Sequence, residues 1–269
     1  MRTVVGAAPQ LREKMTLRLS LCACASRPVQ CDVGSEKGFG LPYAWGVNDE
    51  VLEKSHTNFV QVVSCNTHAI SRIILACTDN SPKTLVSSDI VCIRRANDAS
   101  QDGGYVPSPT AGKHDDDLYG THHARDVSDL IETVTGEALP IYSSAMKVNT
   151  QYMHMVRFSI VIDQKASREW IVRRFKEDKF IATTQHTSVN KVFSFGRDHG
   201  YYGRIYNQAV VCLPSLSVTQ DGNNTRITGY AMTPQDGNSL LSSISATVWG
   251  LHSSMSAAKC LDNYLLKEV

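Results

Sequence analysis

Residues 59–77 read FVQVVSCNTHAISRIILAC and join two hydrophobic patterns. The first five residues form a short apolar run, which is typical of a buried strand. Beyond Asn66, apolar side chains recur at helical spacing, at Ile70, Ile73, Ile74 and Cys77. The stretch therefore predicts a strand, a tight turn and a helix, with Cys65 in the turn.

Patterns on either side of this unit predict an α+β protein with one main sheet. Further strands are expected at 89–95, 147–162, 191–195, 209–213, 216–219 and 226–232. Helices are expected over 128–134, after a cap at Ser167, and from residue 239 onward. Residues 1 to about 50 show no sustained periodicity. Because strands outnumber the helices between them, an α+β fold is favoured over a doubly wound one.

Composition places the chain among ordinary soluble globular proteins, with 42% hydrophobic and 20% charged residues in 269. A formal charge of +1 favours neither nucleic acid nor an anionic membrane as a partner. Runs of about 18 apolar residues, which would span a membrane, do not occur. The basic bias of the first 30 residues resembles a transit peptide or a poorly ordered leader. Eight cysteines without paired short spacings predict reduced thiols and a cytoplasmic location.

Cys65 is a candidate nucleophile because of its place before a helix. The positive end of the helix dipole and the unpaired backbone N–H groups favour the thiolate. Asn66 or Thr67 is expected to cap the helix, and the same N–H groups can receive an oxyanion. The alternative is a small apolar residue packed beside the helix, as free cysteines usually are.

His154 and the pair Arg94 and Arg95 each have two interpretations. His154 ends the apolar face of a strand, so it is either a hydrogen-bonded core residue or a desolvated imidazole that stays neutral and acts as a base. The two arginines follow a buried run and point to opposite sides of the strand. One of them can hold phosphate, although a structural ion pair is the commoner outcome.

Residues 114–126 are dense in histidine and aspartate. One interpretation is a hydrolytic metal site built from His114 to His123, which requires these groups to converge in space. The other places His122, His123 and Arg125 ahead of a helix starting near Asp126, where backbone N–H groups help to hold a phosphate anion.

Four segments, in this order, resemble the type II, archaeal-type glyceraldehyde-3-phosphate dehydrogenases: 62–67 (VVSCNT), 93–98 (IRRAND), 121–127 (THHARDV) and 147–155 (KVNTQYMHM). The resemblance implies a C-terminal catalytic-like domain over residues 43–269, a mainly antiparallel or mixed sheet with helices packed on one face. Residues 1–42 would be an irregular leader or a remnant of the nucleotide-binding domain. The last helices, from about residue 239, would pack on the cofactor domain.

The resemblance also implies a phosphorylating enzyme of glycolysis and gluconeogenesis that oxidises glyceraldehyde 3-phosphate through a cysteine thioester, with inorganic phosphate as second substrate and hydride passing to NAD or NADP. Cys65 would be the nucleophile and His154 the general base. The implied phosphate ligands are Arg95, Arg94, His122, His123 and Thr67. Asn238 would approach the nicotinamide.

Several departures from the family pattern qualify this expectation. His68 replaces the usual threonine or glycine, Val156 and Arg157 replace a second histidine, and residues 114–119 lengthen the phosphate loop. A Gly-x-Gly-x-x-Gly fingerprint is missing, so most of the cofactor domain is absent. The resemblance implies a homotetramer, or a partner that supplies the cofactor domain. Apolar surface at Leu261 and Leu265 would favour self-association. The alternatives are a non-catalytic phosphate-binding or assembly module and the metal-dependent hydrolase.

Overall fold

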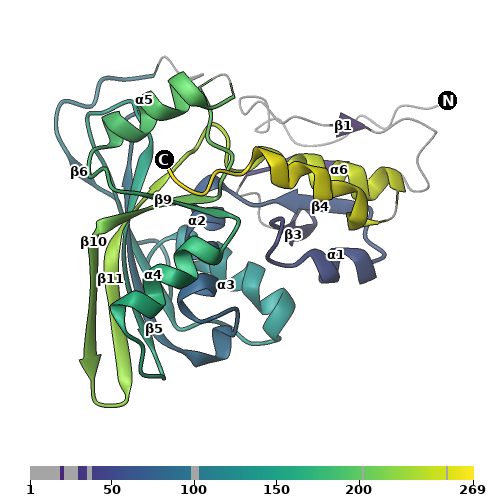
Figure 1. Cartoon of the computed structure of the whole chain (residues 1–269). Coiled ribbons are helices and arrows are strands. Elements are labelled where there is room, and N and C mark those ends of the chain that lie inside the picture. The colour runs from purple at the N-terminus through teal and green to yellow at the C-terminus, as the bar shows by residue number, and fades with distance from the viewer. Residues whose placement is uncertain (1–18, 21–29, 35–37, 98–102, 202, 253) are drawn as a thin grey trace.

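The structure, a computed structural model, describes residues 19–20, 30–34, 38–97, 103–201, 203–252 and 254–269. These residues form a seven-stranded sheet and a separate four-stranded sheet, with helices between and around them (Figure 1). Most of the basic first 30 residues, where a leader is predicted, lies outside the described residues.

The larger sheet is mixed, which confirms the prediction of a mixed sheet combined with helices. Its order is β6 (Thr110–Ala111), β7 (Ile141–Lys147), β5 (Leu85–Arg94), β8 (His154–Ile162), β11 (Asn224–Thr233), β10 (Ala209–Asp221) and β9 (Ile181–Thr184). The pairs β5–β7 and β9–β10 are parallel and the other pairs are antiparallel. A single strand over 147–162 was predicted wrongly. The chain breaks at 148–153 because β7 and β8 pair with opposite edges of β5.

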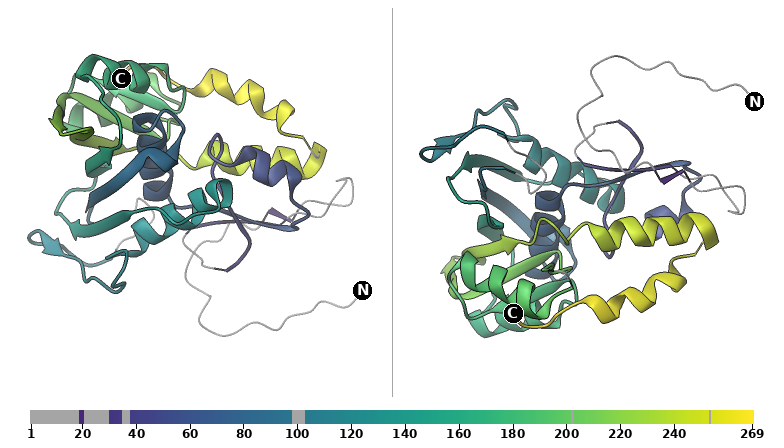
Figure 2. Two further views of the ribbon diagram at one scale, coloured as in Figure 1. Left: turned by 90° about the horizontal axis from the view of Figure 1, so that it is seen from below. Right: turned by 90° about the horizontal axis from the view of Figure 1, so that it is seen from above.

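Three helices cover one face of this sheet and form the main core: α2 (Cys65–Cys77), α3 (His122–Thr135) and α4 (Arg168–Glu177). They are seen from two further directions in Figure 2. Ile70, Ile131 and Ile171, one from each helix, are buried against Phe158 and Ile160 of β8. The strand–turn–helix prediction for residues 59–77 is confirmed, since β4 (Phe59–Val62) leads through Ser64 into α2.

One helix lies on the other face, so the expectation that all helices pack on one face is wrong. α5 (Val189–His199) buries Val192 against Val210 and Met232. The strand neighbours of these two residues belong to the main core, and successive strand residues point to opposite faces. The predicted strand at 191–195 is also wrong, because these residues belong to α5. Its less exposed positions follow helical spacing, at Val189, Val192, Phe193 and Gly196.

The smaller sheet has the order β1 (Leu19–Ser20), β2 (Gln30–Val33), β4, β3 (Leu41–Tyr43), with β2, β4 and β3 parallel. With α1 (Asp49–Lys54), these strands correct the prediction that residues 1 to about 50 are irregular. These strands are short and pair over long distances in the sequence, so they show little hydrophobic periodicity. The strands on the two sides of residue 43 pair in this one sheet.

The C-terminal helices cover the smaller sheet. α6 (Leu240–His252) and the 3-10 segment η2 (Met255–Tyr264) place Trp249 and Leu261 against Tyr43 and Val60. Leu261 is only 6% exposed and Leu265 is half-buried, so the expected apolar exposure at these two residues is wrong. A short 3-10 turn, η1 (Pro82–Thr84), leads into β5.

Among the described residues, no helix combines the length and the apolar character needed to cross a bilayer.

Candidate functional site

Cys65 is the first residue of α2 and is half-buried. Ser64 caps the helix: its Oγ accepts a hydrogen bond from the Thr67 N–H at 3.4 Å and lies 2.8 Å from the Thr67 hydroxyl. The expectation that Asn66 or Thr67 is the cap is therefore wrong. Thr67, a predicted phosphate ligand, is fully buried with its hydroxyl on Ser64.

The backbone of Cys65 is also held from the C-terminal part of the chain. Asn238 donates from Nδ2 to the carbonyl oxygen of Cys65 at 2.8 Å and to that of Gln208 at 3.1 Å. The Asn238 side chain is buried at 1% exposure. The Asn238 Nδ2 group thus bonds the carbonyls of Cys65 and Gln208, and the contact of Asn238 with a nicotinamide stays a prediction.

His154 begins β8 and is 3% exposed. Its Nδ1 lies 3.4 Å from Oδ1 of Asn66, the residue after Cys65. An amide oxygen only accepts, so Nδ1 of His154 is the donor in this hydrogen bond. The strand register pairs Met155 with Ile93, which brings Arg94 opposite His154 on the face covered by α2 and α3.

Electrostatic effects on two buried groups show that these residues converge. The pKa of His123 falls to about 2, first through burial and then through the charges of His122, Arg94 and His154. The pKa of Cys92, which lies in the core beneath the site, rises to about 12 through burial and the nearby Cys65, and Arg94 opposes this rise. His122, Arg94 and His154 therefore lie near His123, and His154 also contacts Asn66 in the first turn of α2.

His122 and His123 open helix α3, which begins four residues before the predicted start near Asp126. Their rings lie 4.0 Å apart, centre to centre. In the first turn of α3, the Ala124 N–H is satisfied because it donates to Ser143 Oγ at 3.0 Å. In contrast, neither ring nitrogen of the buried His123 has a hydrogen-bond partner among the described residues. A buried polar group of this kind costs stability unless a ligand satisfies it. A helix N-terminus with two histidines and an arginine suits an anion.

Arg95 points to the opposite face from Arg94 and binds a carboxylate. Its guanidinium donates to both oxygens of Asp236, at 3.1 and 3.3 Å, and the arginine side chain is 4% exposed. Of the two arginines predicted to bind phosphate, Arg94 is the one on the His154 face.

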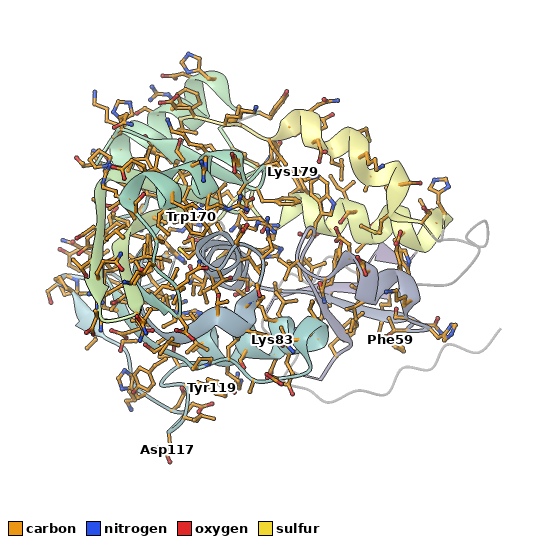
Figure 3. The ribbon with its side chains drawn as sticks, turned by 60° about the horizontal axis from the view of Figure 1, so that its bottom comes forward. Phe59, Lys83, Asp117, Tyr119, Trp170 and Lys179 are labelled. Carbon is orange, nitrogen blue, oxygen red and sulfur yellow. The ribbon has the colours of Figure 1, made fainter. Side chains whose placement is uncertain are left out.

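The polar groups of the loop over 114–119 bond to β7, to the loop's own backbone or project outward, and do not converge. His114 contacts Tyr142 and Ser144 through its two ring nitrogens, both at 3.1 Å, and Asp116 accepts two backbone N–H groups of its own turn. Asp117 projects away from the body of the molecule (Figure 3). Within the described ranges, no group of three or more His, Cys, Asp or Glu residues could hold a metal ion. The metal-dependent hydrolase therefore has no ligand cluster in this part of the chain.

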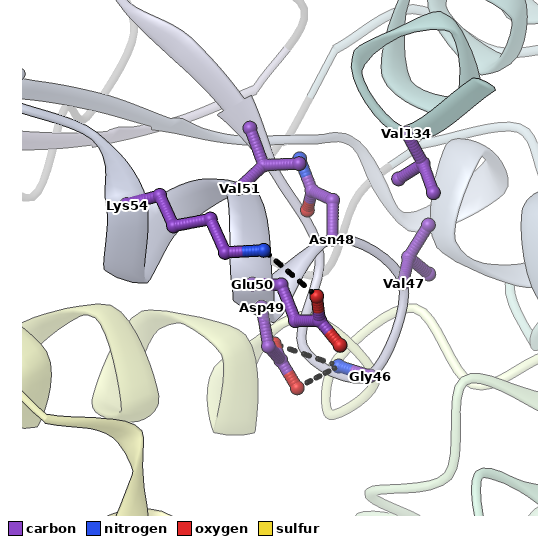
Figure 4. Close-up of a pocket in the computed structure, with 8 residues that line it drawn as sticks. All are labelled: Gly46, Val47, Asn48, Asp49, Glu50, Val51, Lys54 and Val134. Atoms are coloured by element: carbon purple, nitrogen blue, oxygen red, sulfur yellow. Dashed lines mark hydrogen bonds and ion pairs between the residues drawn. The ribbon is translucent and has the colours of Figure 1, made fainter.

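A cavity of about 420 Å³ opens elsewhere, between α1 and the end of α3 (Figure 4). Its walls include Val51 and Val134, and the Gly46 N–H donates to both Asp49 oxygens at 3.0 Å. Burial raises the pKa of Asp49. None of the predicted site residues lines this cavity.

Two residues at the site escaped sequence reasoning. His68, noted only as a departure from the family, is fully buried, with Nδ1 2.9 Å from the Ser64 carbonyl and Nε2 2.8 Å from Ser242 Oγ. Ser242 lies 174 residues further along the chain, and no local pattern connects the two. The Ser64 cap did carry a local signal, a serine directly before the helical repeat.

Comparison with known proteins points in the same direction as these contacts. No protein-family model matches the sequence. Proteins named glyceraldehyde-3-phosphate dehydrogenase do: that of Methanocaldococcus jannaschii is 30% identical over 173 residues, that of Archaeoglobus fulgidus 28% over 189, and that of Sulfurisphaera tokodaii 26% over 158. The chain is therefore similar to part of the archaeal glyceraldehyde-3-phosphate dehydrogenases.

These alignments cover 61%, 67% and 55% of this chain, but 47%, 50% and 42% of the three relatives. The chain thus spans about half the length of the curated relatives it matches. The predicted resemblance to archaeal glyceraldehyde-3-phosphate dehydrogenases is confirmed over that part.

Proposed function

We propose that this chain carries the aldehyde- and phosphate-binding part of a glyceraldehyde-3-phosphate dehydrogenase, with Cys65 as its nucleophile. The names of the archaeal relatives support this reaction class. The observation that carries the proposal is the buried, unpartnered His123, which lies with Arg94 and His154 beside the start of α2.

The thiol step uses His154 and Cys65. With its Nδ1 proton directed at Asn66, His154 takes the thiol proton at Nε2. The thiolate then attacks the aldehyde carbon: a carbon–sulfur bond forms while the carbonyl electron pair moves to oxygen. The N–H groups of the first turn of α2 favour that negative charge.

The phosphate group of the substrate would bind at the start of α3. Arg94, His122 and His123 supply donors there, and the helix N-terminus favours an anion. His123 is neutral in the free protein because its pKa is about 2. A bound phosphate would accept a hydrogen bond from its ring and end the cost of the unsatisfied group.

The described residues do not fit a complete dinucleotide site. The sequence has no glycine fingerprint, and the Asn238 amide is turned toward the Cys65 carbonyl. No hydride step is therefore derived from these residues. We propose that NAD or NADP is bound by groups outside them, on a partner or on another copy of the chain. A homotetramer is expected from the resemblance, and a monodisperse monomer in light scattering would contradict it.

Substrate protection of the thiol tests the proposal. Glyceraldehyde 3-phosphate should slow the reaction of Cys65 with iodoacetamide, followed by mass spectrometry of its peptide, at lower concentration than glyceraldehyde does. Arg94→Ala should remove this difference between the two aldehydes. Arg157→Ala is the matched control, because Arg157 pairs with Asp89 on the opposite face of the sheet.

Two results would contradict the proposal. Cys65 that reacts no faster than the exposed Cys260 is not an activated thiol. Equal protection by the two aldehydes would exclude a phosphate site. Phosphate binding without an activated Cys65 would instead favour a non-catalytic phosphate-binding module.

A further inference from the structure

The carbonyl oxygen of Ser64 accepts two hydrogen bonds from one residue. The backbone N–H of His68 donates at 3.0 Å, and the ring Nδ1 of His68 lies at 2.9 Å. This carbonyl belongs to the peptide group that joins Ser64 to Cys65. Its orientation therefore fixes the peptide plane from which Cys65 enters the helix.

Each proton in this network can be placed from its partners. A carbonyl oxygen only accepts, so Nδ1 of His68 carries a proton. The ring is neutral because burial lowers its pKa to about 4, and Nε2 then bears a lone pair. Ser242 donates its hydroxyl proton to that nitrogen at 2.8 Å and accepts the Trp45 N–H at 3.0 Å. The chain of donors runs from Trp45 through Ser242 and His68 to Ser64.

A second bond from the same part of the chain holds the next peptide group. Asn238, two residues before α6, donates to the Cys65 carbonyl. The peptide groups on both sides of Cys65 are thus fixed by residues on or next to α6, one of them through His68. α6 itself packs on β4, the strand that leads to Cys65 (Figure 1).

We propose that His68 and Ser242 are positioning residues for the nucleophile, so that α6 sets the direction in which Cys65 presents its thiol and backbone. The inference rests on the proposed role of Cys65. It goes beyond that role in assigning a task to a histidine found where the family usually has threonine or glycine. Misplacement of a nucleophile by about 1 Å can lower a rate 100-fold, so orientation at this residue matters.

The first test measures Cys65 alkylation by iodoacetamide in the full chain, resolved by peptide and followed across pH. Ser242→Ala should slow Cys65 about fivefold, the ratio expected for one lost hydrogen bond, and should leave Cys260 unchanged in the same sample. Ser242→Thr keeps the hydroxyl and should restore the rate. Ser243→Ala is the matched control, because the Ser243 hydroxyl donates to the carbonyl oxygen of Ser239 in its own segment.

The second test reads the tautomer without reference to reactivity. Nitrogen-15 spectra of histidine-labelled protein should show His68 neutral, with its proton on Nδ1, and Ser242→Ala should shift the Nε2 resonance. Loss of the signal in His68→Phe assigns it. If that variant does not fold, a spectrum of Ser242→Ala assigns the same resonance by its shift.

Three results would overturn the proposal: an Nε2-protonated or charged ring at neutral pH, an unchanged Cys65 rate in Ser242→Ala, or a Ser242→Thr variant as slow as Ser242→Ala. Failure of the proposed function is seen separately, in unmodified protein, as a Cys65 rate equal to that of Cys260. The ratio of variant to unmodified rate and the tautomer still decide the positioning role in that case.

Discussion

The starts of α2 and α3 each contain a fully or nearly fully buried histidine, but the two rings have opposite surroundings. His68 is 0% exposed and has a partner at both nitrogens, whereas His123 is 3% exposed and has a partner at neither. Burial lowers the pKa of each, to about 4 and about 2. The His68 ring at the start of α2 is thus satisfied within the chain, whereas the His123 ring at the start of α3 is not. The proposed phosphate would satisfy the second ring.

The largest effect is expected when the thiol at the start of α2 is removed and the phosphate site proposed at the start of α3 is kept. Cys65→Ser should abolish the reversible thiohemiacetal with glyceraldehyde 3-phosphate, measured as the loss of its bound carbon-13 resonance when the aldehyde carbon of the substrate is labelled. It should leave the thermal stabilisation by inorganic phosphate unchanged, because that anion is assigned to α3. A loss of phosphate stabilisation in this variant would show that the two helix starts are one site. Cys260→Ser is the matched control, since Cys260 is exposed on η2.

The next largest effect should be the acid dependence of stability that His68 contributes. The pKa of His68 in the folded protein, about 4, lies below the ordinary histidine value of 6.5, so the unfolded chain binds the extra proton as pH falls. Stability is fully present above about pH 6.5 and falls toward pH 4, by about 3 kcal/mol from this group. Urea unfolding of unmodified protein and His68→Phe should show that difference in slope. Parallel curves for the two proteins would contradict it.

Replacing each ring by leucine gives the most direct comparison. His68→Leu should lower the free energy of unfolding by about 2 kcal/mol, because it removes two hydrogen bonds and strands Ser242. His123→Leu should raise it by about 1 kcal/mol in phosphate-free buffer, because it removes an unsatisfied buried group. It should also cancel stabilisation by phosphate. Chemical unfolding with and without phosphate measures both, and equal losses for the two variants would refute the contrast.

The smallest effect is expected at the cap of α2. Ser64→Ala removes the side-chain bond to the Thr67 N–H and should cost about 1 kcal/mol. Ser243→Ala, which loses one bond within α6, should cost less. The same urea titrations measure this difference. A Ser64→Ala protein as stable as Ser243→Ala would show that His68 and Asn238 hold the turn without the cap.

Local sequence patterns predicted many of the helices and strands of this fold, but few of the contacts between them. The short apolar run at residues 59–63 and the helical spacing after Asn66 predicted β4 and α2. The same approach failed at 191–195, where a short apolar run fits either period. It also failed for β2 and β3, whose strands are short and pair over long distances.

At the site, sequence reasoning found the residue types but not their partners. The two sides of a strand predicted that Arg94 and Arg95 diverge, yet nothing local indicated that Asp236 would occupy Arg95. The unsatisfied state of His123 depends on what packs around it. The Arg95–Asp236 pair joins residues 141 positions apart, and a period of two or 3.6 contains no information about such a contact.

The distance along the chain between Cys65 and its anchors has a consequence for synthesis. Asn238 follows Cys65 by 173 residues, and Ser242 follows His68 by 174. At about 5–20 residues per second, a ribosome needs roughly 9–35 seconds to add that length. During that interval β4 and α2 exist without α6, and the thiol has neither of its distant supports. Reactivity at Cys65 is therefore expected to mature only after residues 238–242 have been added and have packed.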